Sequence, residues 1–337
     1  MTSQILLLAA ALALSTVATG LVRVLALRWG VLDIPNARSS HTRITPRGGG
    51  LAIVFVYLAS VLVLASWGTI PGNYALALLG GLAIAVVGWI DDRRGLSPAK
   101  RAAVHASAAA WAVFWAGGLP EARLGALVLP LGALGAVLAV VGIVWTINLY
   151  NFMDGIDGLA GLQAVVVAGA GGLLLSAAGL GGLAMSAWLL GAASLGFLFW
   201  NWQPARIFMG DVASGMLGYT FAVIALFSEN AGGVPLVGWA ILLGVFITDA
   251  TATLIRRLLQ RKKWYEAHRE HAFQRAVQHG FSHARVTLAV AAINGLLAAA
   301  VWQALRQPTA LLPALCVSAV ALTLIWAWCQ SLAPKTP

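Results

Sequence analysis

The sequence has few charged residues: aspartate, glutamate, lysine and arginine make up 9% of its 337 residues, against about 25% in soluble domains. Hydrophobic residues make up 60% of the chain, and its mean hydropathy is +0.87. A soluble fold could not bury this much apolar surface while leaving so few charges to solvate its exterior. The composition therefore excludes an ordinary water-soluble protein and predicts an all-α, polytopic integral membrane protein.

Cysteine is also scarce, with two residues in the whole chain. Cys316 and Cys329 lie in one apolar segment, where the intervening helix would separate them by about 20 Å. Cysteines that far apart cannot form a disulfide bond. The sequence therefore offers neither a disulfide framework nor a cysteine-based zinc site.

Apolar runs long enough to cross a hydrocarbon layer of about 30 Å recur along the chain. Turns that contain proline, as at Pro71, Pro120 and Pro308, separate several of them. We expect a single polytopic domain over residues 1–337 with about eleven transmembrane helices, or about ten if one of the shorter runs does not cross. The expected segments are 4–27, 49–67, 74–90, 102–118, 124–145, 159–178, 183–200, 212–227, 234–252, 286–305 and 310–328.

The 21 lysines and arginines are distributed unevenly, and 18 of them fall in alternate loops. The positive-inside rule places these loops in the cytoplasm and the N-terminus outside, so that eleven spans would leave the C-terminus inside. The net charge of +10 thus follows the membrane boundary and does not indicate a nucleic-acid partner. The expected cytoplasmic loops are 28–48, 91–101, 146–158, 201–211 and 256–285.

Nine of the 11 acidic residues lie in or beside the same loops. A basic surface that bound only anionic lipid would not need carboxylates at the ends of apolar segments. Such charges are costly at a membrane boundary unless they are paired, hydrated or bound to a metal ion. These carboxylates are therefore candidates for a functional site.

The first candidate motif contains the adjacent carboxylates of Asp91 and Asp92, followed by Arg93 and Arg94. Two such carboxylates repel each other unless a cation lies between them, and Mg²⁺ prefers oxygen ligands of this kind. The alternative is a solvated loop in which the aspartates only neutralise the two arginines.

The second candidate motif places Asn148, Asn151, Asp154 and Asp157 at intervals of three residues. Neighbours in such a series share a helical face, and the glycine after each aspartate indicates a helix that ends and opens into a loop. Carboxylates and amides would then converge on one polar site. A simple Asp-Gly turn between two spans would explain the glycines but not the asparagines.

Further candidates lie in three other loops. Arg206 suits a phosphate group, and the carboxylate of Asp211 suits a metal ion. The small residues after Asp211 would let the backbone approach a ligand closely. The loop that contains Arg43 ends in three glycines and could cradle phosphate. The lysines and arginines of segment 256–285 could contribute to the site, or the segment could be an interfacial helix that only binds anionic lipid. Asp249 is open to two interpretations, a structural ion-pair partner of Arg256 or a catalytic group.

Taken in order, these motifs resemble those of the polyprenyl-phosphate N-acetylhexosamine-1-phosphate transferases. This membrane family, glycosyltransferase family 4, includes the muramoyl-pentapeptide transferase of cell-wall synthesis and the enzymes that initiate O-antigen chains. The resemblance covers nearly the whole chain. The matching segments are SSHTRITPRGGG, WIDDRRGLSP, NLYNFMDGIDGLAG, NWQPARIFMGDVASGMLGY and the basic segment that ends in HGFS.

The resemblance implies a role for each matching residue. Asp91 and Asp92 match the family's Asp-Asp pair, which acts as base, nucleophile or metal support, and Asp154 joins them as a catalytic residue. Asp211 matches the magnesium ligand, and Asp157 matches a residue near the uracil. The substrate-binding residues that the resemblance implies are Arg43, Asn148, Asn151, Asp157, Arg269 and His271. Arg206 joins them as a substrate-binding candidate because arginine suits a phosphate group.

One departure from the family concerns the sugar. The family commonly reads His-x-His-His where this chain has His271, Ala272, Phe273 and Gln274. An apolar ring and a neutral amide would suit a less hydroxylated hexosamine, such as a 6-deoxy N-acetyl sugar, unless these positions face solvent. N-acetylglucosamine is the alternative sugar.

The sequence therefore predicts transfer of an N-acetylhexosamine 1-phosphate from a UDP-sugar to undecaprenyl phosphate, with release of UMP. The expected cation is Mg²⁺, with Mn²⁺ as a substitute, and we expect direct attack by the lipid phosphate rather than a covalent aspartyl-phosphate. The expected location is the bacterial cytoplasmic (inner) membrane, in an O-antigen or other envelope pathway; a homodimer is left open. The competing interpretations are a proton-coupled secondary transporter, with intramembrane carboxylates as a relay, and a non-catalytic lipid-binding scaffold.

Overall fold

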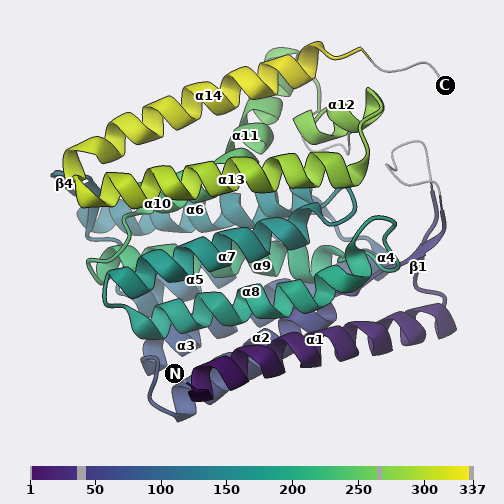
Figure 1. Cartoon of the computed structure of the whole chain (residues 1–337), viewed down its shortest axis with the longest axis horizontal. Coiled ribbons are helices and arrows are strands. Elements are labelled where there is room, and N and C mark those ends of the chain that lie inside the picture. The colour runs from purple at the N-terminus through teal and green to yellow at the C-terminus, as the bar shows by residue number, and fades with distance from the viewer. Residues whose placement is uncertain (1, 36–42, 264–267, 334–337) are drawn as a thin grey trace.

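The computed structural model describes residues 2–35, 43–263 and 268–333, which are almost entirely helical (Figure 1). The helices are α1 (Thr2–Arg28), α2 (Leu51–Ser66), α3 (Gly72–Leu79), α4 (Gly81–Arg94), α5 (Pro98–Ala116), α6 (Gly132–Met153), α7 (Leu159–Ala177), α8 (Gly181–Asn201), α9 (Asp211–Asn230), α10 (Leu236–Leu242), α11 (Gly244–Leu259), α12 (Ala272–Gln278), α13 (His283–Arg306), the 3₁₀ turn η1 (Pro308–Ala310) and α14 (Leu311–Ser331). The strands form two antiparallel pairs, β1 (Leu32–Asp33) with β2 (Thr45–Pro46) and β3 (Glu121–Leu124) with β4 (Leu127–Pro130).

Within the described residues, 8 helices are long and apolar enough to span a membrane, and the bent pair α10–α11 raises the number to 9. Helix α2 is apolar but has 16 residues. The chain is thus an all-α, polytopic membrane protein, as the composition predicts. Each expected apolar segment overlaps a helix or a pair of helices.

The long helices lie side by side in a bundle (Figure 1), in which α8 and α9 are the most buried spans. Small residues allow close approach, as between α1 and α8, where Ser15 Oγ donates to the carbonyl oxygen of Ala193 at 2.6 Å. A Cβ at Gly196 would lie 2.5 Å from the carbonyl oxygen of Leu12. Packing through small residues and polar side chains is typical of membrane helices, since the hydrophobic effect does not drive their association in lipid.

The expected segment 124–145 is wrong at its start, because β3 and β4 form a hairpin there and α6 begins only at Gly132. The buried carboxylate of Glu229, at the end of α9, accepts hydrogen bonds from the backbone N–H of Arg123 at 2.8 Å and from its guanidinium at 3.1 Å. This tertiary anchor holds apolar residues in strands that hydropathy alone assigns to a helix. Helix α6 also extends eight residues beyond the expected end, to Met153, and includes Asn148 and Asn151.

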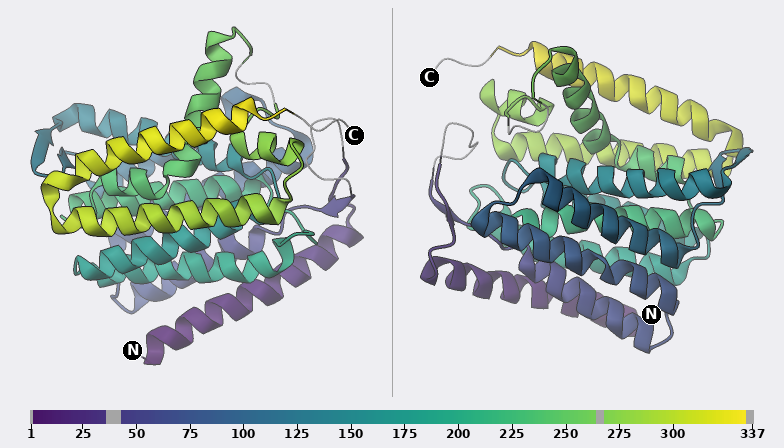
Figure 2. Two further views of the ribbon diagram at one scale, coloured as in Figure 1. Left: turned by 45° about the horizontal axis from the view of Figure 1, so that its top comes forward. Right: turned by 180° about the vertical axis from the view of Figure 1, so that it is seen from behind.

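Helices α10 and α11 meet at a bend of 80°, and α11 runs at a steep angle to the long helices (Figure 2). Asp249 on α11 is buried and accepts the backbone N–H groups of Ala272 at 2.9 Å and Phe273 at 3.3 Å. It therefore caps the first turn of α12, a short helix inside the expected cytoplasmic loop 256–285. The suggested partner Arg256 instead donates to Gln330.

The described parts of the five loops expected in the cytoplasm meet at one end of the bundle (Figure 1). This end is where α1, α4 and α6 terminate and where α9 and α13 begin, while the β3–β4 hairpin lies at the other end. The fold thus gathers the polar motifs of the sequence on one side. Residues 39–42 of the segment SSHTRITPRGGG, which contains Arg43, lie outside the described residues.

Candidate active site

Backbone pairing joins the loop before α2 to the loop before α9. The N–H groups of Gly48 and Gly49 both donate to the carbonyl oxygen of Phe208, at 3.1 and 2.9 Å, and the N–H of Phe208 donates to Pro46 at 2.8 Å. Arg47 lies between these bonds, so its Cα is fixed beside the start of α9. Backbone hydrogen bonds alone thus hold together two loops that are more than 150 residues apart in the sequence.

Two glycines allow a close approach around Asp211, the first residue of α9. A Cβ at Gly88 of α4 would overlap the carbonyl oxygen of Asp211. Gly210 has a φ of +80°, which residues with a side chain rarely adopt, and a Cβ there would lie 2.5 Å from Oδ2 of Asp92. Because neither residue has a side chain, α4 and α9 can come into contact at the place where their carboxylates lie.

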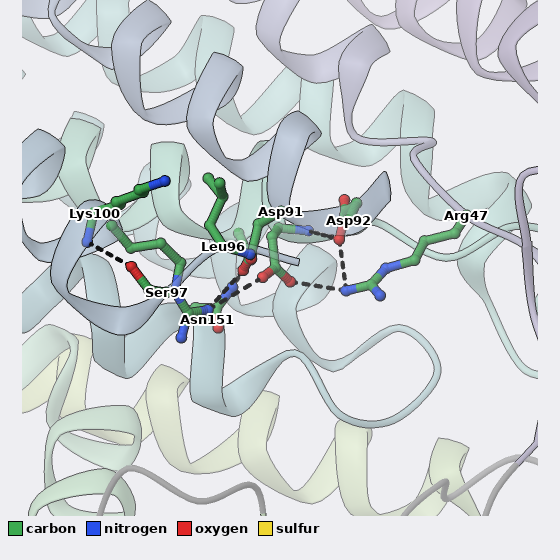
Figure 3. A network of polar contacts seen from close by, with 10 residues as sticks. Arg47, Asp91, Asp92, Leu96, Ser97, Lys100 and Asn151 are labelled. Atoms are coloured by element: carbon green, nitrogen blue, oxygen red, sulfur yellow. Dashed lines mark hydrogen bonds and ion pairs between the residues drawn. The ribbon is translucent and has the colours of Figure 1, made fainter. Parts of the chain in front are cut away.

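The carboxylates of Asp92 and Asp211 share one guanidinium (Figure 3 shows Arg47 and Asp92). Nη2 of Arg47 lies 2.7 Å from Oδ1 of Asp92 and 2.9 Å from Oδ1 of Asp211. The same oxygen of Asp92 accepts the backbone N–H of Asp211 at 3.2 Å. The side chain of Asp92 is 2% exposed and that of Asp211 is 22% exposed, so this cluster is open to solvent on the Asp211 side.

Asp91 points to different partners. Its Oδ2 lies 2.7 Å from Nη1 of Arg101 on α5, and its Oδ1 accepts the backbone N–H of Leu96. Arg101 also lies 3.9 Å from Asp211. The two adjacent aspartates therefore have different contacts: Asp91 connects α4 to α5, and Asp92 contacts the start of α9.

The second motif lies against this cluster. Asn151 donates to Ser214 Oγ on α9 at 3.0 Å, whereas Asn148 donates to the carbonyl oxygen of Val144 in its own helix at 2.7 Å. Asp154 is the C-cap residue of α6 and lies outside the apolar span. Burial raises the pKa of Asp154 to about 7; Arg47 opposes this rise, and the nearby carboxylates of Asp211 and Asp92 add to it.

The raised pKa of Asp154 predicts a pH-dependent stability. From about pH 4 to pH 7 the unfolded chain has released this proton while the folded protein keeps it, so the contribution to the free energy of unfolding falls as pH rises. Asp154→Asn removes the titrating group. We expect the melting temperature of the wild type, relative to the variant, to fall by about 3 °C between pH 5 and pH 8, measured in detergent with EDTA. A difference that stays constant with pH would contradict the prediction.

Asp157 is used in contacts within the protein. Its Oδ2 accepts the backbone N–H of Ala205 at 3.1 Å, and its Oδ1 lies 3.4 Å from Nδ1 of His283. The hydroxyl of Thr287 donates to its carbonyl oxygen at 3.2 Å. Asp157 therefore joins the second motif to the loop before α9 and to the start of α13. Its predicted position beside the uracil stays a prediction.

Two of the predicted basic residues lie apart from the cluster. The side chain of Arg43 is exposed, and its carbonyl oxygen accepts the hydroxyl of Thr45 at 3.1 Å. The side chain of Arg206 is exposed too, with its guanidinium 5.8 Å from the ring centre of Trp200. The structure thus brings Asp92, Asn151, Asp154 and Asp211 together, but it leaves Arg43 and Arg206 at the rim.

The basic segment contacts the second motif through rings. His271 is buried; its Nδ1 lies 3.3 Å from Oδ1 of Asp249, and its ring stacks on Phe273 with 5.8 Å between centroids. Phe273 packs against Gly155, where a Cβ would lie 2.8 Å from its ring. The carbonyl oxygen of Arg269 accepts the side-chain amide of Gln278 at 3.0 Å.

Two residues of the cluster were absent from the predicted site. Arg47 stands directly before the three glycines that end the loop containing Arg43. Arg101 lies at the end of the expected loop 91–101, which begins with the Asp-Asp pair. The signal for both was the concentration of arginine in the expected cytoplasmic loops. That signal did not distinguish Arg47 and Arg101, which contact the aspartates, from Arg93, whose guanidinium lies 4.2 Å from the ring centre of Trp89.

The cluster fits a divalent cation. Among the described residues no group of three or more His, Cys, Asp or Glu side chains is placed to hold a metal ion alone, but Mg²⁺ usually binds one or two carboxylates together with substrate phosphates and water. Asp211 and Asp92 offer two such carboxylates. Oδ2 of Asp92 is buried and has no hydrogen-bond partner within the described ranges, which is costly for a carboxylate oxygen unless a cation approaches it.

Comparison with known proteins agrees with these motifs. The model of the family described as glycosyl transferase family 4 matches residues 74–229. The chain is 31% identical over 283 residues to the probable undecaprenyl-phosphate N-acetylglucosaminyl 1-phosphate transferase of Bacillus subtilis, covering 81% of this chain and 76% of that protein. It is 31% identical over 320 residues to the decaprenyl-phosphate N-acetylglucosaminephosphotransferase of Mycolicibacterium smegmatis, covering 83% and 77%.

A relative with a different named activity matches over a smaller part of the chain. The phospho-N-acetylmuramoyl-pentapeptide-transferase of a Picosynechococcus species is 34% identical over 224 residues, covering 62% of this chain and 59% of that protein. The similarity to the first two relatives extends over most of both chains, and the matched region contains Asp91, Asp92, Asn151, Asp154 and Asp211. The chain therefore belongs to glycosyl transferase family 4.

Proposed function

We propose that this protein transfers an N-acetylhexosamine 1-phosphate from a UDP-sugar to undecaprenyl phosphate, releasing UMP. The observation that supports this most is the joining of Asp92, Asp211 and Arg47 at the end of the bundle where the expected cytoplasmic loops meet. A lipid phosphate and a soluble nucleotide-sugar could both reach a site at a membrane boundary. The activities named for the two relatives that match most of the chain point to the same reaction.

In this reaction an oxygen of the lipid phosphate attacks the phosphorus that carries the sugar. A P–O bond to the lipid phosphate forms, the bond to UMP breaks, and UMP leaves with the electron pair. A phosphate monoester is largely ionised near neutral pH, so the attacking group needs no strong base. The work of the protein is in-line positioning and neutralisation of charge, which supports direct attack rather than an aspartyl-phosphate.

Individual residues would supply these effects as follows. Asp92, positioned by the backbone N–H of Asp211, would orient the attacking phosphate or accept a residual proton from it. Asn151, held on Ser214, would orient the diphosphate. Asp211 and Asp92 would hold Mg²⁺, or Mn²⁺ in its place, and the cation when bound would neutralise the diphosphate.

We further propose the topology of eleven spans in the bacterial cytoplasmic membrane, with the N-terminus in the periplasm and the C-terminus in the cytoplasm. The positive-inside rule supports this orientation, because the end of the bundle with the aspartates also carries most of the lysines and arginines. A role in O-antigen or other envelope polysaccharide synthesis would follow from the undecaprenyl acceptor.

A secondary transporter is less well supported. Transporters place their coupling carboxylates near the midplane, in broken helices. Here the carboxylates of Asp92, Asp154 and Asp211 lie at or beyond helix ends. The discriminating experiment is release of radiolabelled UMP from UDP-N-acetyl sugars by the purified protein. Release that depends on added polyprenyl phosphate is expected, and its absence with every sugar would refute the proposed function.

We propose a 6-deoxy N-acetyl sugar as the donor sugar. Phe273 and Gln274 are both buried, so these positions do not face solvent, and Phe273 lies against Gly155 of the second motif. A sugar methyl group could lie against the ring without leaving a buried polar group unpaired. N-acetylglucosamine, the sugar named for the relatives, is the competing donor.

We expect the wild type to use UDP-N-acetylfucosamine or UDP-N-acetylquinovosamine with a kcat/KM about tenfold above that for UDP-N-acetylglucosamine. Phe273→His/Gln274→His should reduce this ratio. The side chain of Gln274 accepts the N–H of His271 at the start of α12, so Phe273→His alone is the matched variant that keeps this cap. A wild type that prefers N-acetylglucosamine, or a ratio unchanged in both variants, would show that this segment does not select the sugar.

A further inference from the structure

Arg47 occupies an unusual position among the basic residues of the site. A single nitrogen, Nη2, contacts a carboxylate of α4 at 2.7 Å and a carboxylate of α9 at 2.9 Å. A nitrogen placed between two carboxylate oxygens lies where a small cation would also be most stabilised, because both positions are set by the same pair of anions. The guanidinium of Arg47 and a divalent cation would therefore occupy the same place between the two carboxylates.

The charges of the contacting groups are consistent with an exchange. Three carboxylates, those of Asp91, Asp92 and Asp211, contact two guanidiniums, those of Arg47 and Arg101. Without Arg47, the remaining group would carry a formal charge of −2 when ionised, which one divalent cation neutralises. Arg101 has its own carboxylate in Asp91, whereas Asp92 depends on Arg47.

The surroundings of Arg47 allow its side chain to move while its backbone stays fixed. The backbone on either side is held by hydrogen bonds to Phe208. The side chain is 33% exposed and lines a cavity of about 710 Å³, together with Trp29, Ile34 and Arg93. The guanidinium can therefore leave the carboxylates and remain at the site, where it is available to a phosphate oxygen.

We propose that Arg47 is a positioning residue that competes with the divalent cation for Asp92 and Asp211. In the absence of the cation it holds the two carboxylates together; when the cation binds, the guanidinium is released towards the phosphates of the substrates. The release of the guanidinium towards substrate phosphates rests on the proposed function. The competition itself concerns only the protein and the cation.

The test is Mn²⁺ binding to the purified protein in lipid nanodiscs, measured without nucleotide or lipid phosphate by the electron paramagnetic resonance signal of free Mn²⁺. Arg47→Gln removes the competing charge, so we expect its Kd for Mn²⁺ to fall about tenfold below that of the wild type. The matched control is Arg93→Gln, which removes one charge from the same cavity but leaves the carboxylates paired. Its Kd should stay within about twofold of the wild type. A purely structural Arg47 would give the opposite result, with Mn²⁺ binding weakened in Arg47→Gln.

If Arg47→Gln is unstable without metal, its melting temperature in the presence of Mn²⁺ provides a second measurement. Because Mn²⁺ would replace the missing guanidinium, it should raise the melting temperature of Arg47→Gln more than that of the wild type. Equal or smaller stabilisation, or a Kd unchanged within about twofold, would overturn the proposal. UMP release separates the two claims: a wild type without turnover refutes the proposed function, whereas an active wild type with unchanged Mn²⁺ binding in Arg47→Gln refutes the competition alone.

Discussion

Replacement of Asp211 by asparagine is expected to reduce kcat by at least about 100-fold. Asp211 is the first residue of α9, and its carboxylate is the more exposed of the pair that shares Arg47. A site that relies on two carboxylates for its cation loses much of its affinity when one of them becomes neutral. The measurement is UMP release across a series of Mg²⁺ concentrations.

The control for Asp211→Asn is Glu121→Gln, which neutralises an exposed carboxylate on β3, at the far end of the bundle. We expect this variant to retain wild-type turnover, which excludes a general effect of net charge. An Asp211→Asn protein with near-normal activity and an unchanged Mg²⁺ requirement would remove Asp211 from the site.

The second large effect is expected for Asp92→Asn, with a loss of kcat of about 100-fold or more. The side chain of Asp92 is almost completely buried and contacts both Arg47 and the backbone of Asp211. If the two adjacent aspartates only neutralised arginines in water, each pair would contribute about 0 to 1 kcal/mol and the change would be nearly silent.

The neighbouring Asp91→Asn is the matched variant, because it makes the same chemical change one residue away. The sequence predicts a steep loss of kcat for both aspartates, with folding largely intact. The contacts of Asp91 with Arg101 and Leu96 now lead us to expect a lower melting temperature and a smaller loss of kcat in this variant. Equal losses of kcat at unchanged stability would contradict that division. A radiolabelled phospho-protein formed from UDP-sugar without lipid would contradict direct attack.

Hydropathy predicted the helices well, because the length of a membrane-spanning helix is set by the bilayer and is visible in the local sequence. It failed at residues 124–130, which it assigned to a helix, because the hairpin there depends on the contact between Arg123 and Glu229. It also could not predict the bend of 80° between α10 and α11, or that Asp249 caps α12, since both depend on packing between distant elements.

The sequence by itself determined the class of protein, the order of the motifs and the family, because composition and motif spacing are properties of the chain alone. Tertiary structure decided which motif residues meet. Arg47 and Asp211 are 164 residues apart and meet because two loops pair through backbone hydrogen bonds and because glycines let α4 touch α9. In the same way, α5 supplies Arg101 as the partner of Asp91, and the start of α13 supplies His283 as the partner of Asp157. Adjacent or evenly spaced aspartates look equivalent in a sequence, and only the elements packed against each carboxylate distinguish them.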